Sequence, residues 1–251
     1  MCMTMPGVQD ASPHPARHAA LTISVCIPAR DEAETIGAIV SRLVQGGRVT
    51  QVIVCDDGST DATATIARES GAYVVSTSAG RGKGGAMRVA AATATGDILV
   101  FLDADVRNFD DASVDRLVAP LVADPSLVLV KGTYRRPMKG VAGEGGRVTE
   151  LLARPLIELL RPELAFVRQP LAGETAVRRE VLDAVGLADG YAVEIALLLA
   201  VADEWGPTAI AQVDLGERVH RNRRLDELAV QSREILAAVL QREFPARAAS
   251  A

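Results

Sequence analysis

The sequence has few aromatic residues and few cysteines, and each shortage excludes a class of protein. Phe, Tyr and Trp make up 3% of the 251 residues and apolar residues 49%, so the core of this chain is expected to be large and aliphatic. The cysteines, Cys2, Cys26 and Cys55, have no regular spacing, which excludes a disulfide framework and a cysteine-rich zinc site. Cys26 and Cys55 lie in apolar stretches and are expected to be buried and reduced, as in a cytoplasmic protein.

Long apolar runs and basic blocks are also missing. No apolar run reaches the roughly 18 residues that a transmembrane helix needs, so no stable membrane insertion is expected. The formal net charge is −5 and Lys and Arg form no block, which argues against nucleic acid as a partner. Residues 1–20 contain no hydrophobic segment of a signal peptide, so we expect a disordered tail there and a second tail at residues 245–251.

Between these tails, strands and helices are predicted to alternate. Short apolar runs are typical of buried parallel strands, and the amphipathic segments between them are typical of helices. The strands are predicted at residues 21–28, 51–57, 72–76, 98–102 and 127–134, and the helices at residues 31–45, after residue 61, and at 86–94 and 111–122. This order predicts βαβ units, hence an α/β fold with a mostly parallel sheet flanked by helices.

The pattern changes after Arg136. The glycine-rich residues 138–146 predict a loop, and further strands are expected at residues 172–177 and 208–215. Helices are predicted at residues 147–160, 191–205 and 225–242. No linker divides the chain. We therefore expect one domain, in which a first half (residues 21–136) binds a nucleotide and a second half (residues 137–244) completes the same site.

A pair of carboxylates follows the fourth predicted strand. The apolar residues 98–102 lead into Asp103-Ala-Asp105, and alternation along an extended chain points both carboxylates the same way. Ligands of open parallel sheets bind beyond the carboxyl ends of the strands. Two neighbouring anions favour a cation between them, and hard oxygen ligands beside a diphosphate suit Mg²⁺ or Mn²⁺. A strand end followed by an Asx turn is the alternative, and the motif alone does not decide between them.

Three more loops at predicted strand ends carry groups suited to a nucleotide. Glu32 could accept hydrogen bonds from a ribose or base, or complement a helix dipole. Residues 56–61 could hold a uracil or ribose edge, or form only a turn and a helix cap. The loop Gly80-Arg-Gly-Lys-Gly-Gly85 could cradle a diphosphate, with Lys83 as the cation. No Walker-type phosphate loop occurs. Because these three loops and the Asp pair all follow successive predicted strands, they together predict a nucleotide diphosphate bound through a divalent metal.

These motifs together resemble a GT-A glycosyltransferase with a Rossmann-like sheet. The second half narrows the resemblance to the glucosyl-3-phosphoglycerate synthase family, a retaining family related to family 2 glycosyltransferases. The similar stretches are residues 131–137, 145–155, 160–164, 169–174, 190–194 and 211–222. The chain departs from the family pattern at Asp56-Asp57, where Asp-Ser is common, at Arg30-Asp31, where Asn is common, and in a shorter segment before the Gly-Lys-Gly loop.

The resemblance implies that glucose is transferred from UDP-glucose to the 2-hydroxyl of 3-phosphoglycerate, with Mg²⁺ or Mn²⁺, in a homodimer. It implies a metal bound by Asp105 and His220, and catalytic roles for Asp105, Glu194 and Leu171. Nucleotide contacts would fall on Ala29, Glu32, Asp57, Lys83 and Asp103, glucose contacts on Leu171, Tyr191 and Glu194, and acceptor contacts on Gly146, Arg147, Val148, Thr149 and Asn222.

Several alternatives stay open at this point. A related enzyme could use GDP-glucose or GDP-mannose, or another phosphorylated or carboxylated acceptor. A polyprenyl-phosphate glycosyltransferase would need a basic or hydrophobic surface near the acceptor loop, for which Arg135, Arg136 and Lys139 are weak support. A non-catalytic nucleotide-sugar-binding module would be favoured by loss of Asp105 or His220, and both residues are present.

Overall fold

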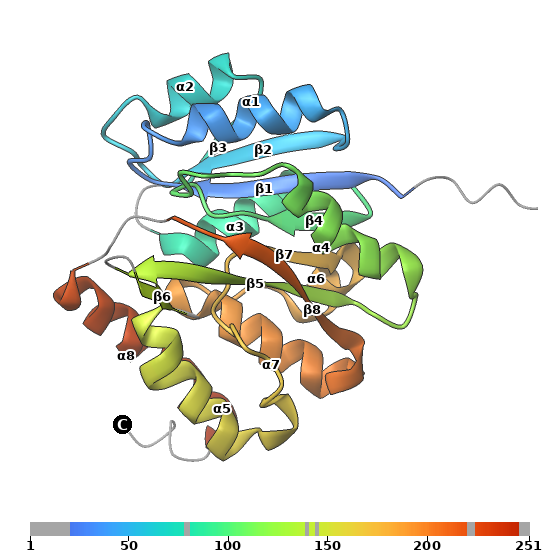
Figure 1. Cartoon of the computed structure of the whole chain (residues 1–251), viewed down its shortest axis with the longest axis vertical. Coiled ribbons are helices and arrows are strands. Elements are labelled where there is room, and N and C mark those ends of the chain that lie inside the picture. Colours follow the sequence, from blue (N-terminus) through green and yellow to red (C-terminus); the bar gives the residue numbers. More distant parts are fainter. Residues whose placement is uncertain (1–20, 78–80, 139–140, 144–145, 220–223, 246–251) are drawn as a thin grey trace, which may run out of the picture.

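The computed structural model describes residues 21–77, 81–138, 141–143, 146–219 and 224–245. They form one mixed sheet covered by helices on both faces, in the order β3-β2-β1-β4-β7-β5-β6, with β8 paired to β5 (Figure 1). The strands are β1 Ile23–Ala29, β2 Gln51–Asp56, β3 Tyr73–Ser76, β4 Ile98–Phe101, β5 Leu129–Met138, β6 Val141–Gly143, β7 Thr175–Arg178 and β8 Ile210–Glu217.

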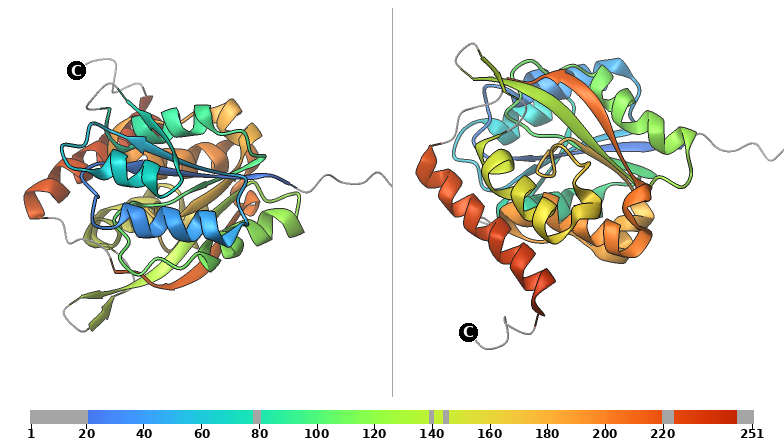
Figure 2. Two further views of the ribbon diagram at one scale, coloured as in Figure 1. Left: turned by 90° about the horizontal axis from the view of Figure 1, so that it is seen from above. Right: turned by 60° about the horizontal axis from the view of Figure 1, so that its bottom comes forward.

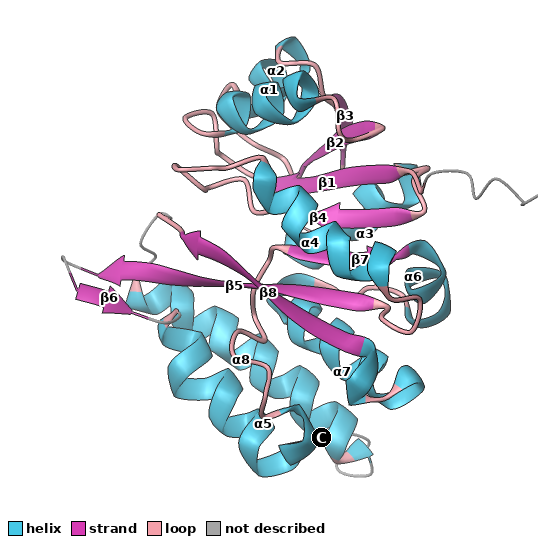
Figure 3. Ribbon diagram, turned by 45° about the vertical axis from the view of Figure 1, so that its right-hand side comes forward, coloured by secondary structure: helices cyan, strands magenta, loops and turns pink. Residues whose placement is uncertain are grey.

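Most of the strands run in one direction, as expected for this α/β fold. Strands β1 to β4 pair in parallel, and β5 pairs in parallel with β8. Strand β7 lies between β4 and β5 and is antiparallel to both. A strand from the second half of the sequence is thus inserted into the sheet of the first half, and residue 136 is no boundary in space (Figure 3).

Helices cover both faces because the strand residues alternate between two aliphatic clusters. In β4, Ile98 and Val100 face one cluster, and Leu99 and Phe101 face the other. The first face carries α1 Ile36–Gly46, α2 Thr63–Glu69 and α4 Ala112–Ala123. The second face carries α3 Gly82–Thr93, α5 Arg154–Leu160, α6 Arg179–Val185, α7 Val193–Trp205 and α8 Leu225–Glu243.

Helix α8 runs along the outside of the second half (Figure 2). It contacts the short 3-10 turn Gly190–Ala192 and the π-helical turn Thr149–Ala153 that precedes α5. Among the described residues, no helix is long and apolar enough to cross a membrane. Cys26 and Cys55 are free and buried, as predicted, and burial raises the pKa of each thiol to about 12.

Four local differences separate the structure from the expectations. Helix α1 begins at Ile36 instead of residue 31, because Asp31 has a positive φ of 53° and residues before Ile36 form turns. Helix α3 begins at Gly82, so Lys83 lies in its first turn and not in a preceding loop. The predicted loop at residues 138–146 contains β6, and α6 was not predicted. Residues 1–20 and 246–251 lie outside the described part of the chain.

Candidate active site

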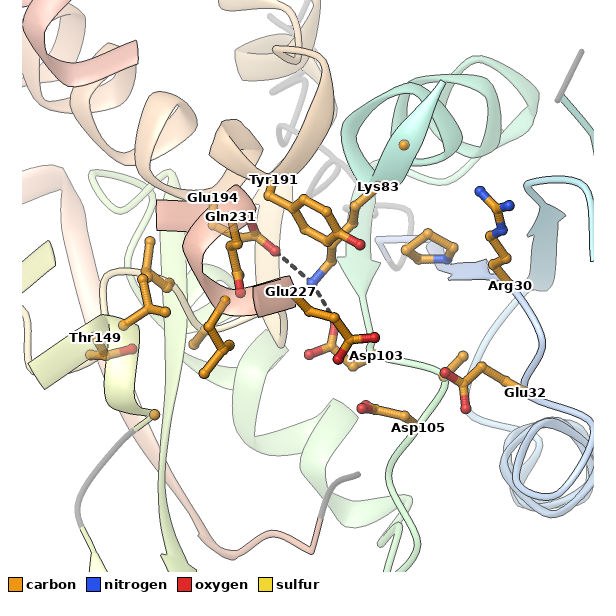
Figure 4. A pocket seen from close by; sticks show the side chains of 18 of the residues that line it. Arg30, Glu32, Lys83, Asp103, Asp105, Thr149, Tyr191, Glu194, Glu227 and Gln231 are labelled. Carbon is orange, nitrogen blue, oxygen red and sulfur yellow. Dashed lines mark hydrogen bonds and ion pairs between the residues drawn. The ribbon is translucent and has the colours of Figure 1, made fainter. Parts of the chain in front are cut away.

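A cleft of about 770 Å³ opens at the carboxyl ends of the parallel strands. Residues from both halves of the sequence line it (Figure 4). The lining includes every predicted site residue that the structure describes: Ala29, Glu32, Asp57, Lys83, Asp103, Asp105, Gly146, Arg147, Val148, Thr149, Leu171, Tyr191 and Glu194. The other two predicted residues, His220 and Asn222, lie outside the described residues.

Hydrogen bonds join the loop after β1 to the loop after β2. The Asp31 carboxylate accepts a hydrogen bond from the Thr60 backbone N–H at 2.7 Å, and this bond lowers the pKa of Asp31. The Asp31 N–H donates to the Ser59 hydroxyl at 3.0 Å. Aspartate and asparagine are among the few residues that adopt a positive φ readily, because their short side chains bond locally. This bonding explains why α1 starts late and why Glu32 faces the cleft.

Asp57 lies at the inner end of the same region and is 5% exposed. Its carboxylate accepts a hydrogen bond from the Thr77 hydroxyl at 2.6 Å, and its backbone N–H donates to the carbonyl of Ala29 at 2.9 Å. An ionised carboxylate only accepts hydrogen bonds, so a base bound here must offer an N–H group. Uracil N3–H meets that requirement.

Lys83 links the two halves of the site. Its ammonium group lies 2.6 Å from Asp103 Oδ1 and 2.5 Å from Glu194 Oε1 (Figure 4). The three side chains come from the first turn of α3, the end of β4 and the first turn of α7. Burial opposes the charge on Lys83, but the two carboxylates outweigh burial and raise the pKa of Lys83. The lysine is therefore a fixed cation at the centre of the cleft.

The Asp103-Ala-Asp105 motif suits a hard divalent cation. Both carboxylates line the cleft just beyond β4, and carboxylate oxygens are preferred ligands of Mg²⁺ and Mn²⁺. The described residues contain no group of three His, Cys, Asp or Glu side chains at metal-binding distances. The predicted third ligand, His220, falls outside this part of the chain. The residues present thus fit a metal that also takes oxygen ligands from a bound diphosphate.

Another side of the cleft is formed by the start of a helix. Gly146 precedes two helical residues, Arg147 and Val148, and Thr149 starts the π-helical turn. Backbone N–H groups in a first turn have no partner within the helix, so they can bind an anion. Arg136 lies next to this helix start, because a Cβ atom on Gly146 would be 3.3 Å from its Nη1. A phosphate placed here would meet N–H groups, a hydroxyl and two guanidinium groups.

Several lining residues were not predicted from the sequence. They include Tyr134, Gln169, Arg218, Glu227 and Gln231, and Arg136, which was considered above only as part of a basic surface, also lines the cleft. Arg218 is 2% exposed, and its Nε and Nη2 have no hydrogen-bond partner among the described residues. Burial lowers the pKa of Arg218. Its position directly after β8, close to His220 in sequence, was the available signal, because strand ends line the site elsewhere in this fold.

Comparison with known proteins adds a family to this geometry. The glycosyl transferase family 2 profile matches residues 24–186. A glucosyl-3-phosphoglycerate synthase of Mycolicibacterium smegmatis is 47% identical over 240 residues, which cover 90% of this chain and 79% of that protein. Similar crystal structures include several of the Mycobacterium tuberculosis enzyme of that name.

One crystal structure contains Mn²⁺, UDP-glucose and phosphoglyceric acid. It is 46% identical, has a TM-score of 0.82, and the match covers 89% of this chain and 80% of that one. Another contains Mg²⁺ and UDP, is 45% identical and has a TM-score of 0.82, with coverage of 89% and 80%. The similarity therefore spans both halves of the sequence and includes both walls of the cleft.

Proposed function

The chain belongs to glycosyl transferase family 2, together with glucosyl-3-phosphoglycerate synthases that it matches along nine-tenths of its length, and from this premise we propose that it is a metal-dependent retaining glucosyltransferase. It moves glucose from UDP-glucose to the 2-hydroxyl of 3-phosphoglycerate and releases UDP and glucosyl-3-phosphoglycerate. The single observation that carries the proposal is Lys83, whose ion pairs with Asp103 and Glu194 join the diphosphate side of the cleft to the sugar side.

The nucleotide would bind against residues from the first half of the sequence. Ala29, Glu32 and Asp57 line the part of the cleft that would hold uridine, and Asp57 offers an acceptor to uracil N3–H. Asp103 would lie at the ribose or diphosphate. Asp105, with His220 as the predicted partner, would hold Mg²⁺ or Mn²⁺. A bound divalent cation stabilises the negative charge that develops on the departing diphosphate.

Glucose would bind between residues of the first and second halves of the chain. Leu171, Tyr191 and Glu194 line the cleft beside Lys83, and Glu194 would accept hydrogen bonds from glucose hydroxyls. Lys83 would donate to the diphosphate and offset the charge on UDP as the glycosidic bond breaks. No carboxylate of the cleft is an evident covalent nucleophile. We therefore favour attack from the same face as the leaving group, in which the departing phosphate accepts the proton of the acceptor hydroxyl.

The acceptor lies against the helix start at Gly146. Its phosphate would accept hydrogen bonds from the backbone of Arg147 and Val148, from the Thr149 hydroxyl and from the Arg147 guanidinium. Asn222 is the predicted additional acceptor contact. This arrangement fits a small phosphorylated acid. It offers no long apolar channel for a polyprenyl chain within the part of the cleft that the structure describes.

A homodimer and a cytoplasmic location belong to the same proposal. Leu151 and Leu159 are each 80% exposed and lie eight residues apart, about two helical turns, so they share a face of the helix. Such exposed leucines support a second copy of the chain as the covering surface. Sedimentation of the wild type and of Leu151→Ser/Leu159→Ser tests this part. Monomers in both samples would contradict it.

A matrix of substrates tests the function. UDP-glucose, GDP-glucose and GDP-mannose are each combined with 3-phosphoglycerate or a related hydroxy acid, with Mg²⁺ or with EDTA, and release of the nucleoside diphosphate is measured. The highest rate is expected for UDP-glucose with 3-phosphoglycerate and Mg²⁺, and EDTA abolishes it. Folded protein that releases no UDP with any acceptor would overturn the proposal.

A further inference from the structure

Lys131 is a buried cation that has no part in the mechanism above. It is the third residue of β5, where it pairs with Thr175 of β7 and Gln212 of β8, and it is 1% exposed. Its ammonium group donates to the backbone carbonyl of Ala172 at 2.7 Å. An ammonium group is costly to bury unless a hydrogen bond or an opposite charge compensates it. Packing alone therefore does not explain a buried lysine at this position.

The bonded carbonyl belongs to a loop that forms the floor of the cleft. Leu171 and Ala172 line the cleft, and Gly173 lies so close to Asp103 that an added Cβ would be 2.2 Å from Oδ1. The Thr175 hydroxyl donates to the same carbonyl at 3.2 Å. Lys131 thus holds the position of this loop, which contains the predicted glucose contact Leu171 and lies against Asp103 of the metal motif.

Charged groups in and beside the cleft affect the pKa of Lys131. Burial lowers the pKa of Lys131 to about 8, and this effect is the largest; Glu194, Glu174 and Asp103 act in the opposite direction, whereas Lys83 acts with burial. These groups come from α7, the loop before β7, the end of β4 and α3. Ion pairs join Lys83 to Asp103 and Glu194, and of the carboxylates Glu194 has the largest favourable effect on the charge of Lys131.

We propose that Lys131 is a positioning residue for the glucose part of the donor. It holds the Leu171–Gly173 loop through the Ala172 carbonyl and places a positive charge behind the Glu194 carboxylate. It contacts neither substrate and acts through these two neighbours. The inference rests on the proposed function, because it assumes that glucose lies beside Leu171 and Glu194.

Binding of UDP-glucose and of UDP separates this role from general stability. Lys131→Met removes the charge at nearly the same length, and Thr175→Val is the matched control that removes a neutral hydrogen bond to the same carbonyl. In calorimetric titrations with Mg²⁺, Lys131→Met is expected to weaken UDP-glucose about tenfold and UDP less than about twofold. The KM for 3-phosphoglycerate stays unchanged. Thr175→Val weakens UDP-glucose by less than about threefold, as for a neutral hydrogen bond.

Three results would overturn the inference. They are unchanged binding of UDP-glucose to Lys131→Met, equal weakening of UDP and UDP-glucose, and a loss in Thr175→Val as large as in Lys131→Met. The melting temperature of Lys131→Met is expected to be lower than that of the wild type, because removing one member of a buried group of charges leaves its partners uncompensated, so binding is measured at a temperature at which both proteins are folded. If the wild type is active and Lys131→Met binds UDP-glucose normally, only this inference is contradicted. If the wild type is inactive, the proposed function is contradicted.

A measurement on the wild type covers the case in which Lys131→Met does not fold. The ratio of the dissociation constants of UDP-glucose and UDP is measured from pH 7 to pH 9.5. The ratio is expected to rise severalfold around pH 8, where Lys131 loses its proton in the presence of Glu194, Glu174, Asp103 and Lys83. Titration of uracil affects both ligands and cancels in the ratio. A constant ratio across this range would contradict the inference.

Discussion

The two halves of the chain build their share of the cleft in different ways. In the first half, the site residues follow β1, β2 and β4 directly or begin α3, so the parallel sheet brings them to one edge. In the second half, they come from a helix start, a loop and the first turn of α7, and side-chain hydrogen bonds hold these pieces. One wall therefore follows from the fold, whereas the other depends on individual hydrogen bonds, which we call tethers.

Two tethers show how the second wall is held. Glu234 of α8 accepts a hydrogen bond from the backbone N–H of Tyr191 at 2.7 Å and so fixes the turn that begins α7. Asn108 donates to the Glu217 carbonyl at 2.8 Å and accepts from the Val219 N–H at 2.9 Å. The two hydrogen bonds of Asn108 connect the segment around Arg218 to the loop that carries the metal motif.

The largest effect is expected where the two walls meet. Lys83→Ala removes the cation between Asp103 and Glu194 and the predicted donor to the diphosphate, so kcat should fall about a hundred- to a thousandfold. Lys83→Arg keeps the charge and should retain more activity than Lys83→Ala. Steady-state rates at saturating substrates provide the measurement. A decrease of less than about tenfold in Lys83→Ala would remove Lys83 from the centre of the mechanism.

The next effect concerns metal affinity in the first half. Asp105→Asn keeps the shape of the side chain and removes the charge, so the Mg²⁺ concentration for half-maximal rate should rise by more than about tenfold. Asp124→Asn is the control, because Asp124 lies at the end of α4 away from the cleft. Equal metal dependence in the two variants would show that Asp105 is no ligand.

A selective effect is expected in the second half. Arg147→Ala loses a charge-assisted hydrogen bond to the acceptor phosphate, so the KM for 3-phosphoglycerate should rise about tenfold or more, with the KM for UDP-glucose nearly unchanged. Arg154→Ala is the matched control, since Arg154 lies on the same helix, pairs with Glu150 and Glu158, and does not line the cleft. Similar increases for both substrates would place Arg147 outside the acceptor site.

The smallest effect should come from a single tether. Glu234→Gln keeps an acceptor for the Tyr191 N–H, whereas Glu234→Ala removes it. The loss of one such bond is worth about 1 kcal/mol, so Glu234→Ala should raise the KM for UDP-glucose about fivefold and Glu234→Gln less. Kinetics of both variants test this order. An intact KM in Glu234→Ala would show that the turn at Tyr191 holds its position without α8.

The contrast between strand ends in the first half and side-chain hydrogen bonds in the second explains which parts of the site could be predicted from the sequence. The apolar runs that become β1, β2 and β4 are recognisable without context, and their polar ends therefore locate Glu32, Asp57 and Asp103. The antiparallel insertion of β7 could not be predicted, because its pairing depends on tertiary contacts and not on its own pattern. The predicted start of α3 was wrong because glycines suggest a loop, whereas Gly84 and Gly85 are needed for close packing against Ala188 and Arg81.

The buried cations Lys131 and Arg218 left the weakest signal in the sequence. Lys131 looks like an isolated charge in an apolar strand, and Arg218 like an ordinary residue after one. Their importance depends on burial and on the carbonyl and carboxylate groups around them, which come from distant parts of the sequence. The resemblance to a family supplied the positions of Tyr191, Glu194 and the helix start at Gly146, which composition and periodicity alone left undecided.

Nuclear magnetic resonance of the product tests the central claim most directly. UDP-glucose, 3-phosphoglycerate and Mg²⁺ are incubated with the protein, and the anomeric proton and the carbon that carries the new bond are assigned. We expect glucosyl-3-phosphoglycerate with the anomeric configuration of the donor, linked through the 2-hydroxyl and formed in equal amount to UDP. Free glucose with UDP would contradict transfer to the acceptor, and a product of inverted configuration would contradict the proposed retention.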